Sequence, residues 1–399
     1  MLADAFLKKT DVQAVIEPQA WPIEVKVIAA MAAGTVPDVT CIMGKQLVPL
    51  LQQKAIIPME DEVFAPTGIK LEEFFNPGAI GAYFYDGKYW GIPVEDNNVG
   101  FMVGVRTDWV EEAGADAQAL WPVAQDENAY ALESFEQMWN LAELLQKTDE
   151  SGNVTVWGMS GQGWDNRTWY GIMRDLGQNW WDPDNQKFFL NSEAAIEALR
   201  LYVEVPVKER HIETALDTHH LNALLAGKVA VALGNNAMAG EAAKIDIPVE
   251  AVICPPGTPG QNPSFVGEGG WGFEVPVQAK EKTTGIEFLR FICSEEGQYI
   301  WAGIYGGVMP ASPLVMTSDI YQGDGPVKRS TRRGLEALKN TIYYGWGFGI
   351  PSEMENITSS AIQQVRTGEL TSEQACNQMQ TQMEEHFKQW QEGKISVTG

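Results

Sequence analysis

Apolar residues along the chain alternate between helical spacing and short continuous runs. Residues 22–34 carry apolar side chains at helical spacing and end at Gly34, and the "TVPDVTCI" that follows is typical of a short buried strand. A helix around 45–53 and a strand "AIIPM" are predicted next. Because helices and strands take turns in this way, the pattern predicts α/β lobes with largely parallel sheets.

The alternation continues through the middle of the chain. Residues 99–105 predict a strand, and "TDWVEEAG" predicts a helix with Thr107 or Asp108 as its cap and Gly114 at its end. An amphipathic pattern over 133–148 predicts another helix.

Later segments follow the same rule. A helix over 191–205 has Asn191 or Ser192 as a natural cap, and "LNALLAGKVAVALGNNAMAGEAA" predicts a helix, a strand and a helix separated by turns. Residues 254–270 are rich in Pro and Gly and have the composition of a linker. The remaining predicted elements are a strand over "WGFEVP", a helix over 280–293 and, beyond a polar loop around 317–330, helix up to Trp390.

Length and charge limit the classes of protein to which the chain can belong. At 399 residues the chain exceeds the size at which a single core usually stops growing, so two domains are expected. Its 28 basic and 53 acidic residues give a net charge of -25, which opposes binding to nucleic-acid phosphates and anionic lipid surfaces. We therefore expect no nucleic acid among its partners. No apolar run approaches the roughly 20 residues that span a bilayer, and "MLADAFLKKTD" lacks the regions of a signal peptide.

Metal and cofactor chemistry find little support in the sequence. The four cysteines are far apart without CxxC spacing, and only four histidines occur, so we expect no zinc site and no cofactor, while a disulfide stays open. Three enzyme signatures fail on inspection. "GEGGWG" precedes a strand where a dinucleotide site needs a helix, "NALLAGK" lacks the first Gly of a phosphate loop, and "GMSGQ" lacks the last Gly of a nucleophile elbow.

Tryptophans in polar loops are the unusual feature of the composition. Of 14 Trp residues, Trp164, Trp180, Trp181, Trp271 and Trp346 stand beside Gly, Asn or Asp rather than in apolar periodic segments. Each could cover the core of its own lobe or contact a ligand. A sugar presents an apolar C–H face and a rim of hydroxyls, so its site needs aromatic rings together with Asp, Glu, Asn or Gln. The loops "VEDNN", "GQGWDN", "LGNNAM", "GEGGWG" and "YYGWGFG" each supply one or both kinds.

Carboxylates in these loops allow a second interpretation. Glu95, Asp96 and Glu268 could face one another across a cleft as the acid and base of a glycosidase do, although their separation is not encoded in the sequence. They could equally hydrogen-bond a ligand without any proton chemistry, and they would also suit a cationic polyamine. These alternatives stay open on the residues alone.

The order of motifs along nearly the whole chain is more specific than any single motif. The motifs are "VIAAMAAGTVPDV" (27–39), "YFYDGKYWGIPVEDNN" (83–98), "VRTDWVEEAG" (105–114), "DLGQNWWDPDNQKFFLNSEAAIEALRLY" (175–202), "LLAGKVAVALGNNAM" (224–238), "PPGTPG" (255–260), "GIEFLRFICSEEGQYIW" (285–301), "GGVMPA" (306–311) and "VRTGELTSEQAC" (365–376). In this order and spacing they resemble the family 1 extracellular solute-binding proteins of ABC importers, the maltose-binding-protein-like group of sugar-binding proteins.

The resemblance implies the two-lobe periplasmic-binding-protein fold, an α/β fold in which each lobe is a largely parallel sheet flanked by helices, with a hinge between the lobes. We place the N-terminal lobe at residues 1–100 and 272–316, and the C-terminal lobe at residues 101–271 and 317–399. The crossings between lobes would lie near "VEDNN", near "FVGEGG" and after "GGVMPA". Relatives begin with a strand ahead of the helix that "MLADAF" opens, and that strand, a signal peptide and a lipoprotein cysteine are absent from this sequence.

The resemblance also assigns ligand-facing positions. They are Gly44, Lys45 and Gln46 after "PDV", Glu95, Asp96 and Asn97 at the first crossing, Asn235 and Asn236 in "GNN", Glu268 and Trp271 in "GEGGW", and Trp346. The composition of the loops adds Trp164 and Trp181. No catalytic residue and no metal ligand is assigned.

The expected function is that of a non-enzymatic receptor, the substrate-binding component of an ABC importer. It would capture a sugar or short oligosaccharide between two closing lobes and deliver it to ABC permease subunits. Few Arg or Lys residues occur in the cleft loops, so neutral sugars are favoured. We expect a monomer outside the cytoplasm, in the periplasm or lipid-anchored at the cell surface. The alternatives are a glycoside-cleaving enzyme that uses Glu95 or Asp96 with Glu268, and a receptor of the same fold for a non-sugar solute such as a polyamine.

Overall fold

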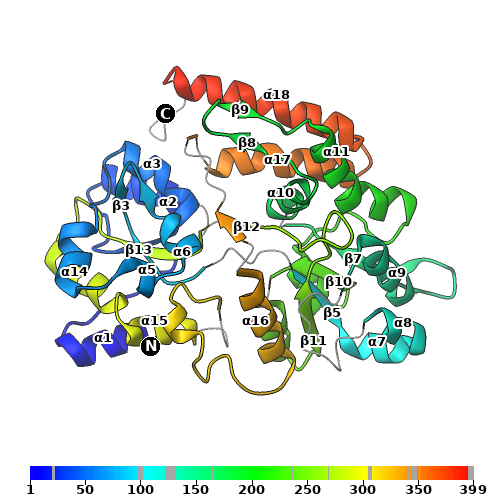
Figure 1. Ribbon diagram of the computed structural model, residues 1–399, viewed down its shortest axis with the longest axis horizontal. Coiled ribbons are helices and arrows are strands. Elements are labelled where there is room, and N and C mark those ends of the chain that lie inside the picture. The colour runs from blue at the N-terminus through cyan, green and yellow to red at the C-terminus, as the bar shows by residue number, and fades with distance from the viewer. Residues whose placement is uncertain are drawn as a thin grey trace.

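Two bodies stand side by side in the structure, which is a computed structural model (Figure 1). The residues that it describes are 1–19, 23–96, 102–121, 132–163, 165–235, 237–267, 269–303, 308–338, 341–343, 348–349 and 351–393. The body on the left of Figure 1 contains a three-stranded sheet, and the body on the right contains a five-stranded sheet. We call them the N-terminal and C-terminal lobes.

The N-terminal lobe is built from two separate parts of the chain. Its helices are α1 (Leu2–Thr10), α2 (Ile23–Ala32), α3 (Leu47–Gln52), α4 (Ala65–Thr67), α5 (Leu71–Phe74), α6 (Pro77–Gly81), α14 (Lys282–Ile292) and α15 (Glu295–Ala302). Its strands are β1 (Thr40–Met43), β2 (Phe84–Tyr85), β3 (Lys88–Tyr89), β4 (Ile92–Pro93) and β13 (Trp271–Glu274). Shorter helical turns are η1 (Gly44–Gln46), η2 (Glu60–Phe64) and η6 (Pro313–Val315).

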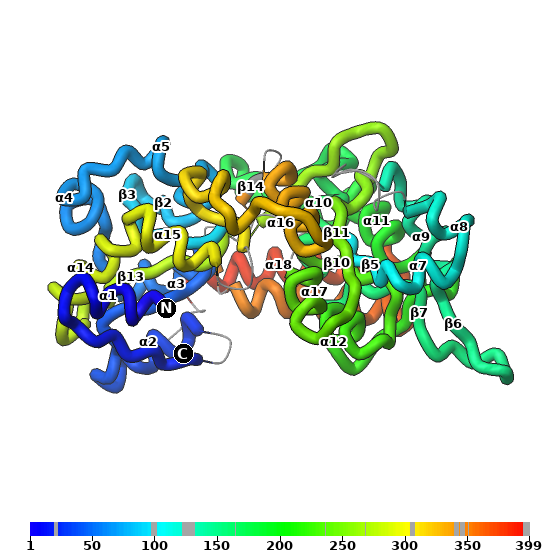
Figure 2. The backbone as a smooth tube through the Cα atoms, turned by 90° about the horizontal axis from the view of Figure 1, so that it is seen from below, coloured from blue at the N-terminus to red at the C-terminus, as the bar shows by residue number. Residues whose placement is uncertain are grey.

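The C-terminal lobe contains the longer helices. They are α7 (Thr107–Ala113), α8 (Ala115–Leu120), α9 (Phe135–Leu145), α10 (Asp165–Asp175), α11 (Glu193–Leu199), which continues into the π-helical η4 (Arg200–Glu209), α12 (His220–Leu225), α13 (Ala237–Ala243), α16 (Pro326–Ala337), α17 (Pro351–Arg366) and α18 (Ser372–Gln391). The strands are β5 (Met102–Arg106), β6 (Lys147–Thr148), β7 (Val154–Ser160), β8 (Trp181–Asp182), β9 (Lys187–Phe188), β10 (Val229–Gly234), β11 (Val249–Ile253), β12 (Phe265–Gly267) and β14 (Thr341–Tyr343). The β6–β7 hairpin projects from the right side of the molecule in Figure 2.

The sheet of the N-terminal lobe is buried on both faces. Its order is β1-β13-β4, and β13 runs antiparallel to both neighbours. Cys41, Phe273 and Ile92 are cross-strand neighbours that pack into one hydrophobic cluster, while Ile42 packs on the other face in a second cluster with Tyr83. Only the end of "TVPDVTCI" lies in β1, and the burial of Thr40, Ile42 and Met43 agrees with the short buried strand predicted there.

Strand directions in the larger sheet are mixed rather than largely parallel. Its order is β11-β5-β10-β7-β6, in which β10 and β7 run parallel, whereas β5 runs antiparallel to β10 and β11. β12 and β14 form a separate parallel pair. The difference arises because β5 and β13 follow the chain's passage from one lobe to the other, so each begins at the sheet edge where its neighbours end.

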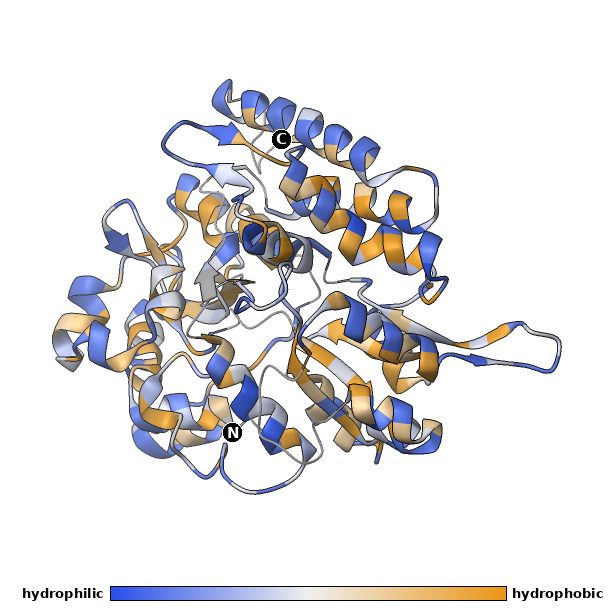
Figure 3. Ribbon diagram, turned by 45° about the vertical axis from the view of Figure 1, so that its right-hand side comes forward, coloured by the Kyte–Doolittle hydropathy of each residue, from blue (hydrophilic) through white to orange (hydrophobic). Residues whose placement is uncertain are grey.

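Hydrophobic packing separates the same two bodies. One cluster collects buried residues from 102–266 and 337–383, together with Met309. A second collects residues from 2–94 and 273–311, and a third packs residues from 27–83 on the opposite face of the smaller sheet. Figure 3 shows polar residues on the outer side of the long helix beside the C-terminus, α18, whose buried residues include Met379 and Met383.

Most of the predicted helices and strands occur where the periodicity placed them. Among them are α2, α9, α14, β1 and β13. The Ser192 hydroxyl caps α11 by accepting from the Ala195 N–H at 3.2 Å, which confirms the cap prediction at that helix.

Other local predictions were wrong because tertiary contacts took over the residues. The cap of α7 is Arg106, not Thr107 or Asp108, and Arg106 donates to both carboxylate oxygens of Asp108 at 2.9 and 2.6 Å. "AIIPM" forms only a single bridge, between Ile56 and Pro276. The expected loop around 317–330 already contains the start of α16, and β14 interrupts the helical C-terminal region.

Candidate functional site

Two loops of the N-terminal lobe meet at one edge of its sheet because β13 is antiparallel to both neighbours. Met43 at the end of β1 pairs with Trp271, and Pro93 at the end of β4 pairs with Gly272. The residues that follow β1 and β4 therefore emerge beside the start of β13. At this place, which we call the N-terminal edge, lie six of the predicted ligand-facing residues, Gly44, Lys45, Gln46, Glu95, Asp96 and Trp271.

The C-terminal lobe presents a comparable edge. β7, β10 and β11 end there and β5 begins there, with Met102 opposite both Gly234 and Ile253. The loop after β10 carries the predicted residue Asn235, and the loop after β7, residues 161–163, leads towards α10. We call this place the C-terminal edge.

The chain passes between the two edges close to Glu95 and Asp96. The Asp96 N–H donates to the Met309 carbonyl at 2.9 Å, and Glu95 forms a bridge with Pro310. Met309 packs in the cluster of the C-terminal lobe, whereas Ala311 packs in the cluster of the N-terminal lobe. Glu95 and Asp96 therefore lie at the boundary between the lobes.

Burial alters the chemistry of the Glu95 carboxyl. Its pKa is raised to about 7, first by burial and then by the adjacent Asp96, against the opposing charge of Arg167. Asp96 is 3% exposed. At neutral pH a large share of Glu95 is therefore protonated, so this side chain can donate as well as accept a hydrogen bond.

Arg167 on α10 is a charged residue of the site that the sequence analysis did not single out. It is 9% exposed, and it acts electrostatically on Glu95 of the other lobe and on His219 of its own lobe. The available signal was its position three residues after Trp164, directly after the polar loop "GQGWDN" that was already a candidate for ligand contact. Arg167 brings a cation to the boundary, which the count of basic residues in the loops had underestimated.

A buried ion network holds the start of α10. The Asp165 carboxylate accepts from Arg366 Nη2 at 2.8 Å and from the Tyr202 hydroxyl at 3.0 Å, and Glu213 accepts from Arg366 Nε at 2.9 Å. The side chains of the three charged residues are at most 7% exposed. This network fixes the backbone from which Arg167 projects.

His219 and His220 add uncharged hydrogen-bonding groups near the C-terminal edge. Their ring centroids are 3.9 Å apart, and His220 Nδ1 lies 3.0 Å from the Gln162 carbonyl. Burial lowers the pKa of both imidazoles, so both are neutral at neutral pH. A neutral imidazole can hydrogen-bond a hydroxyl without the cost of burying a charge.

Lys45 and Gln46 are engaged in contacts within the protein. Lys45 Nζ forms an ion pair with Glu355 on α17 of the other lobe, and Gln46 Nε2 donates to the buried Glu24. The Gln46 side-chain oxygen also accepts from the Met43 N–H at 3.0 Å. Gln46 is completely buried, so in this arrangement its amide supports η1 from within the lobe.

Two glycines permit a close approach to Ala82. A Cβ at Gly44 would lie 2.7 Å from Ala82 Cβ, and one at Gly269 would lie 2.2 Å from it. Gly269 and Gly270 also have positive φ values of 87° and 68°, and the Tyr83 hydroxyl donates to the Gly270 carbonyl at 3.1 Å. The glycines of "GEGGW" are therefore required by the backbone next to Trp271.

The remaining described candidates have different surroundings. Trp271 is partly buried at the N-terminal edge, and the Asn235 side chain accepts from the Ala237 N–H at 3.0 Å at the start of α13. Trp181 lies instead in an aromatic cluster against α18, 9% exposed, with its ring centroid 4.4 Å from that of Phe188 and 5.3 Å from that of Phe387. The predicted residues Asn97, Trp164, Asn236, Glu268 and Trp346 lie outside the described residues.

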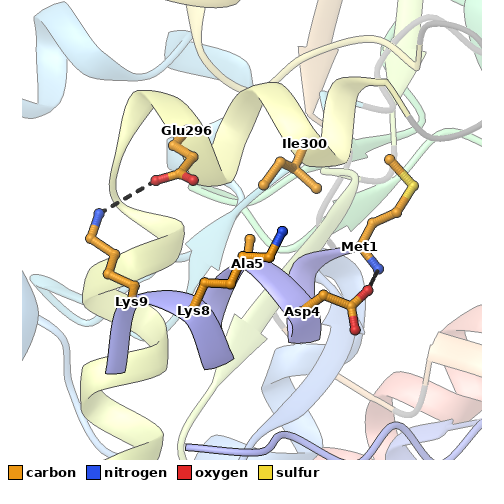
Figure 4. Close-up of a pocket in the computed structure, with 7 residues that line it drawn as sticks. All are labelled: Met1, Asp4, Ala5, Lys8, Lys9, Glu296 and Ile300. Atoms are coloured by element: carbon orange, nitrogen blue, oxygen red, sulfur yellow. Dashed lines mark hydrogen bonds and ion pairs between the residues drawn. The ribbon is translucent and has the colours of Figure 1, made fainter. Parts of the chain in front are cut away.

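A surface groove of about 590 Å3 lies between α1 and α15, apart from both edges (Figure 4). Four of its five charged groups pair with one another, since Lys9 Nζ lies 3.5 Å from Glu296 and the Met1 amino group lies 2.8 Å from Asp4, while the fifth is Lys8. The pairing leaves little charge to attract a solute. We therefore place the candidate site between the edges rather than in this groove.

The described part of the chain contains neither a metal-binding cluster nor a helix that could span a membrane. There, no three His, Cys, Asp or Glu side chains come close enough together to hold a metal ion. Among the same residues, every helix is too short or too polar to cross a bilayer.

The fold and the position of the site define a class, the two-lobe solute-binding proteins. The family described as bacterial extracellular solute-binding protein matches residues 1–328, and the chain belongs to this family. Membership places the protein outside the cytoplasm. No curated protein sequence matches the chain.

Solved structures with the same fold are numerous. An ABC substrate-binding protein from Listeria monocytogenes in complex with cycloalternan has a TM-score of 0.80 and 16% identity, covering 97% of this chain and 95% of that one. The maltodextrin-binding domain MalE from Bdellovibrio bacteriovorus bound to maltotriose has a TM-score of 0.71 and 16% identity, with coverage of 97% and 95%. UgpB from Mycobacterium tuberculosis in complex with glycerophosphocholine has a TM-score of 0.75 and 15% identity, with coverage of 97% and 94%. At these identities the likeness establishes the fold, which is the two-lobe fold expected from the order of motifs.

Proposed function

We propose that the protein is the substrate-binding component of an ABC importer and captures a sugar or short oligosaccharide between its lobes. The observation that carries the proposal is that polar and aromatic side chains from both lobes gather at the lobe boundary in a chain of the extracellular solute-binding family. Proteins with the same fold that were solved with cycloalternan and with maltotriose support a carbohydrate ligand.

The edges supply the groups that a sugar requires. Glu95, Asp96, Asn235 and the neutral His219 offer hydrogen bonds to hydroxyls, and Trp271 offers an aromatic face for C–H groups. Contacts to the second lobe form only when the lobes close, so ligand binding favours closure. To shift the protein from mostly open to mostly closed, the ligand must bind the closed form about 5.5 kcal/mol more strongly than the open form. Several buried hydrogen bonds of about 1 kcal/mol each, together with aromatic contact, can provide this difference.

We propose the lobe boundaries that the motifs implied, residues 1–100 with 272–316 and residues 101–271 with 317–399. The composition of the hydrophobic clusters supports them, because one cluster draws on residues 2–94 and 273–311 and another on 102–266 and 337–383. The finer location, in the periplasm or lipid-anchored at the cell surface, the monomeric state and the ABC permease partner belong to the same proposal.

We further propose that the protein is a receptor and not a glycosidase. The glycosidase alternative pairs Glu95 or Asp96 with Glu268, and Glu268 lies outside the described residues, so the support for a receptor comes from the family. Members of the family are solute-binding proteins of transport. Release of reducing sugar from the bound oligosaccharide, abolished in Glu268→Gln, would contradict the proposal.

A solute with an anionic group is the second candidate ligand. Arg167 at the boundary favours it, and UgpB, which has the same fold, was solved with glycerophosphocholine. A polyamine is the third candidate, since the carboxyl groups of Glu95, Asp96 and Glu268 would suit its amines.

The test is a thermal-shift screen followed by calorimetry. Maltotriose, cycloalternan, an oligouronate, glycerophosphocholine and spermidine are compared, because a ligand at 100 times its Kd stabilises the native state by about 2.7 kcal/mol. We expect a saturable shift with a neutral oligosaccharide, weakened by Asn235→Ala and by Trp271→Ala. A shift only with glycerophosphocholine that is lost in Arg167→Gln would support the second candidate, and a shift only with spermidine the third.

A further inference from the structure

One ion pair joins residues of the two lobes that are far apart along the chain. Lys45 on η1 and Glu355 on α17 are 310 positions apart, and Lys45 Nζ bonds to Glu355 Oε1. Their side chains are 7% and 21% exposed, so the pair is mostly removed from water. In Figure 1 the first turns of α17 point towards α3, which directly follows η1.

Lys45 is held on a supported turn of the N-terminal lobe. The next residue, Gln46, donates to Glu24, which is completely buried, and accepts from the Met43 N–H at 3.0 Å. The preceding residue, Gly44, donates its N–H to the Gly270 carbonyl at 3.2 Å. The turn that presents Lys45 is thus fixed to the sheet on both sides.

Glu355 is equally fixed to the C-terminal lobe. One turn further along α17, the Thr358 hydroxyl donates to Asn166 Oδ1 at 2.7 Å, and at the end of the helix Arg366 binds Asp165 at 2.8 Å. α17 is therefore attached to α10 at two places. Because each partner belongs to a rigid part of its own lobe, moving the lobes apart must separate Lys45 from Glu355.

Lys45 also acts electrostatically on a second carboxyl group, that of Glu24. Glu24 of the N-terminal lobe accepts a hydrogen bond from Gln46, the residue next to Lys45. Burial raises the pKa of Glu24, Glu355 raises it further, and Lys45 lowers it. The three groups are therefore within electrostatic range of one another. Lys45 is thus the cation that acts on both Glu24 and Glu355, and without it any negative charge on Glu24 would face Glu355 uncompensated.

We infer that Lys45 and Glu355 form a latch that holds the two lobes together in the absence of ligand. Formation of the pair favours closure because the hydrogen bond is charge-assisted. Glu355 stays partly exposed to water, so the cost of desolvating its carboxylate is smaller than for a fully buried charge. The latch contributes to closure whether or not a ligand is present. Its importance for solute capture rests on the proposed function, in which the solute enters between open lobes.

Small-angle X-ray scattering of the ligand-free, full-length chain tests the latch. Glu355→Gln removes the charge of one partner and is expected to shift the ratio of open to closed molecules by roughly tenfold, the value for one charge-assisted hydrogen bond, and so to increase the radius of gyration. Lys45→Met is expected to increase it further, because it also leaves Glu24 and Glu355 without the cation between them. Equal scattering curves for the wild type and both variants would overturn the inference.

A matched control lies on the same helix. Glu353→Gln makes the same chemical change two residues earlier, at a side chain that is 52% exposed and lies 3.7 Å from His386 of its own lobe. It is expected to leave the radius of gyration unchanged. An increase as large as that of Glu355→Gln would show that the effect comes from α17 in general and would overturn the latch.

A charge reversal guards against variants that are merely destabilised. Lys45→Glu alone is expected to open the molecule, and Lys45→Glu combined with Glu355→Lys is expected to restore the wild-type radius of gyration, with chemical denaturation run in parallel to confirm folding. Failure of the double variant to restore it would contradict a direct pair. These measurements need no ligand, so their outcome is independent of the thermal-shift screen. The latch can be disproved while the screen still identifies a sugar, and the proposed function can be disproved while the latch is confirmed.

Discussion

At the scale of single residues, burial governs the chemistry of the two edges. It raises the pKa of Glu95 and Glu24 and lowers the pKa of His219 and His220. Each shift favours the neutral form of its group. The boundary between the lobes therefore offers more uncharged hydrogen-bonding groups than its count of ionisable residues suggests, and such groups suit hydroxyls.

Glu95 should make stability depend on pH in a defined window. Its pKa rises from 4.5 to about 7 on folding, so the folded state holds the proton more tightly and stability falls as pH rises from about 4.5 to about 7. We expect Glu95→Gln to remove this part of the decline. Thermal melting of both proteins between those pH values measures the difference, and the exposed Glu62→Gln serves as control. Parallel pH profiles for the wild type and Glu95→Gln would refute the assignment.

Gly269 should be much less tolerant of a side chain than another glycine with the same backbone geometry. Gly269 has φ 87° and its added Cβ would lie 2.2 Å from Ala82, whereas Gly68 has φ 67° and nothing within 4 Å. We expect Gly269→Ala to cost at least about 2 kcal/mol, from backbone strain plus overpacking, and Gly68→Ala about 1 kcal/mol from strain alone. Urea denaturation compares them, and equal losses would show that contact with Ala82 is unimportant.

At the scale of elements, α17 connects several parts of the site. Its side chains reach α10 through Thr358 and Arg366, and the N-terminal lobe through Glu355. α10 in turn carries Arg167 to the boundary. The positions of these charged groups therefore depend on the docking of two helices that are far apart in sequence, and the contact between Thr358 and Asn166 spans 192 positions.

Arg366 should be the most sensitive point of this docking. Arg366→Met leaves Asp165 and Glu213 buried without their cation, so we expect a loss of about 3 to 5 kcal/mol in the free energy of unfolding. Arg200→Met removes an arginine from two carboxylates at a site that is 40% exposed, and we expect about 1 kcal/mol or less. Denaturant titration measures both losses, and similar values for the two variants would contradict the importance of burial.

Trp181 should stabilise the packing of the β8–β9 hairpin on α18. Its ring contacts Phe188 on β9 and Phe387 on α18. We expect Trp181→Ala to cost about 3 to 5 kcal/mol, the usual cost of removing a buried aromatic side chain. We also expect the affinity of the folded variant for its solute to be unchanged. Calorimetry at a temperature below the melting transition measures this affinity. A large loss would show that Trp181 contacts the ligand, as the loop composition predicted.

At the scale of the whole molecule, excess negative charge opposes compaction. The 53 acidic and 28 basic residues leave a net charge of -25. We expect the melting temperature to rise as NaCl increases from about 10 mM to about 150 mM, because the Debye length then falls from about 30 Å to about 8 Å. KCl at equal ionic strength is the control for specific ion effects. A falling melting temperature would show that attractive pairs dominate.

Much of the fold could be predicted because its signals are local. Helical periodicity located α2, α9 and α14, and short apolar runs located β1 and β13. The order of motifs located the residues after β1 and β4, which the sheet then brings together at the N-terminal edge. Strand direction was not predictable in this way, because the antiparallel strands β5 and β13 are buried along most of their length and so lack the alternation that marks a half-exposed antiparallel strand.

By itself the sequence determined the acidic surface, the alternation of helices and strands, the glycines beside Trp271 and the membership of the solute-binding family. Only the tertiary structure decided that Arg167 reaches the boundary, that Trp181 packs against α18, and that Lys45 pairs with Glu355. The physical reason is the distance along the chain over which each kind of interaction acts. Periodicity, turn geometry and charge are properties of neighbouring residues, whereas an ion pair between residues 310 positions apart exists only after two lobes have each folded and met.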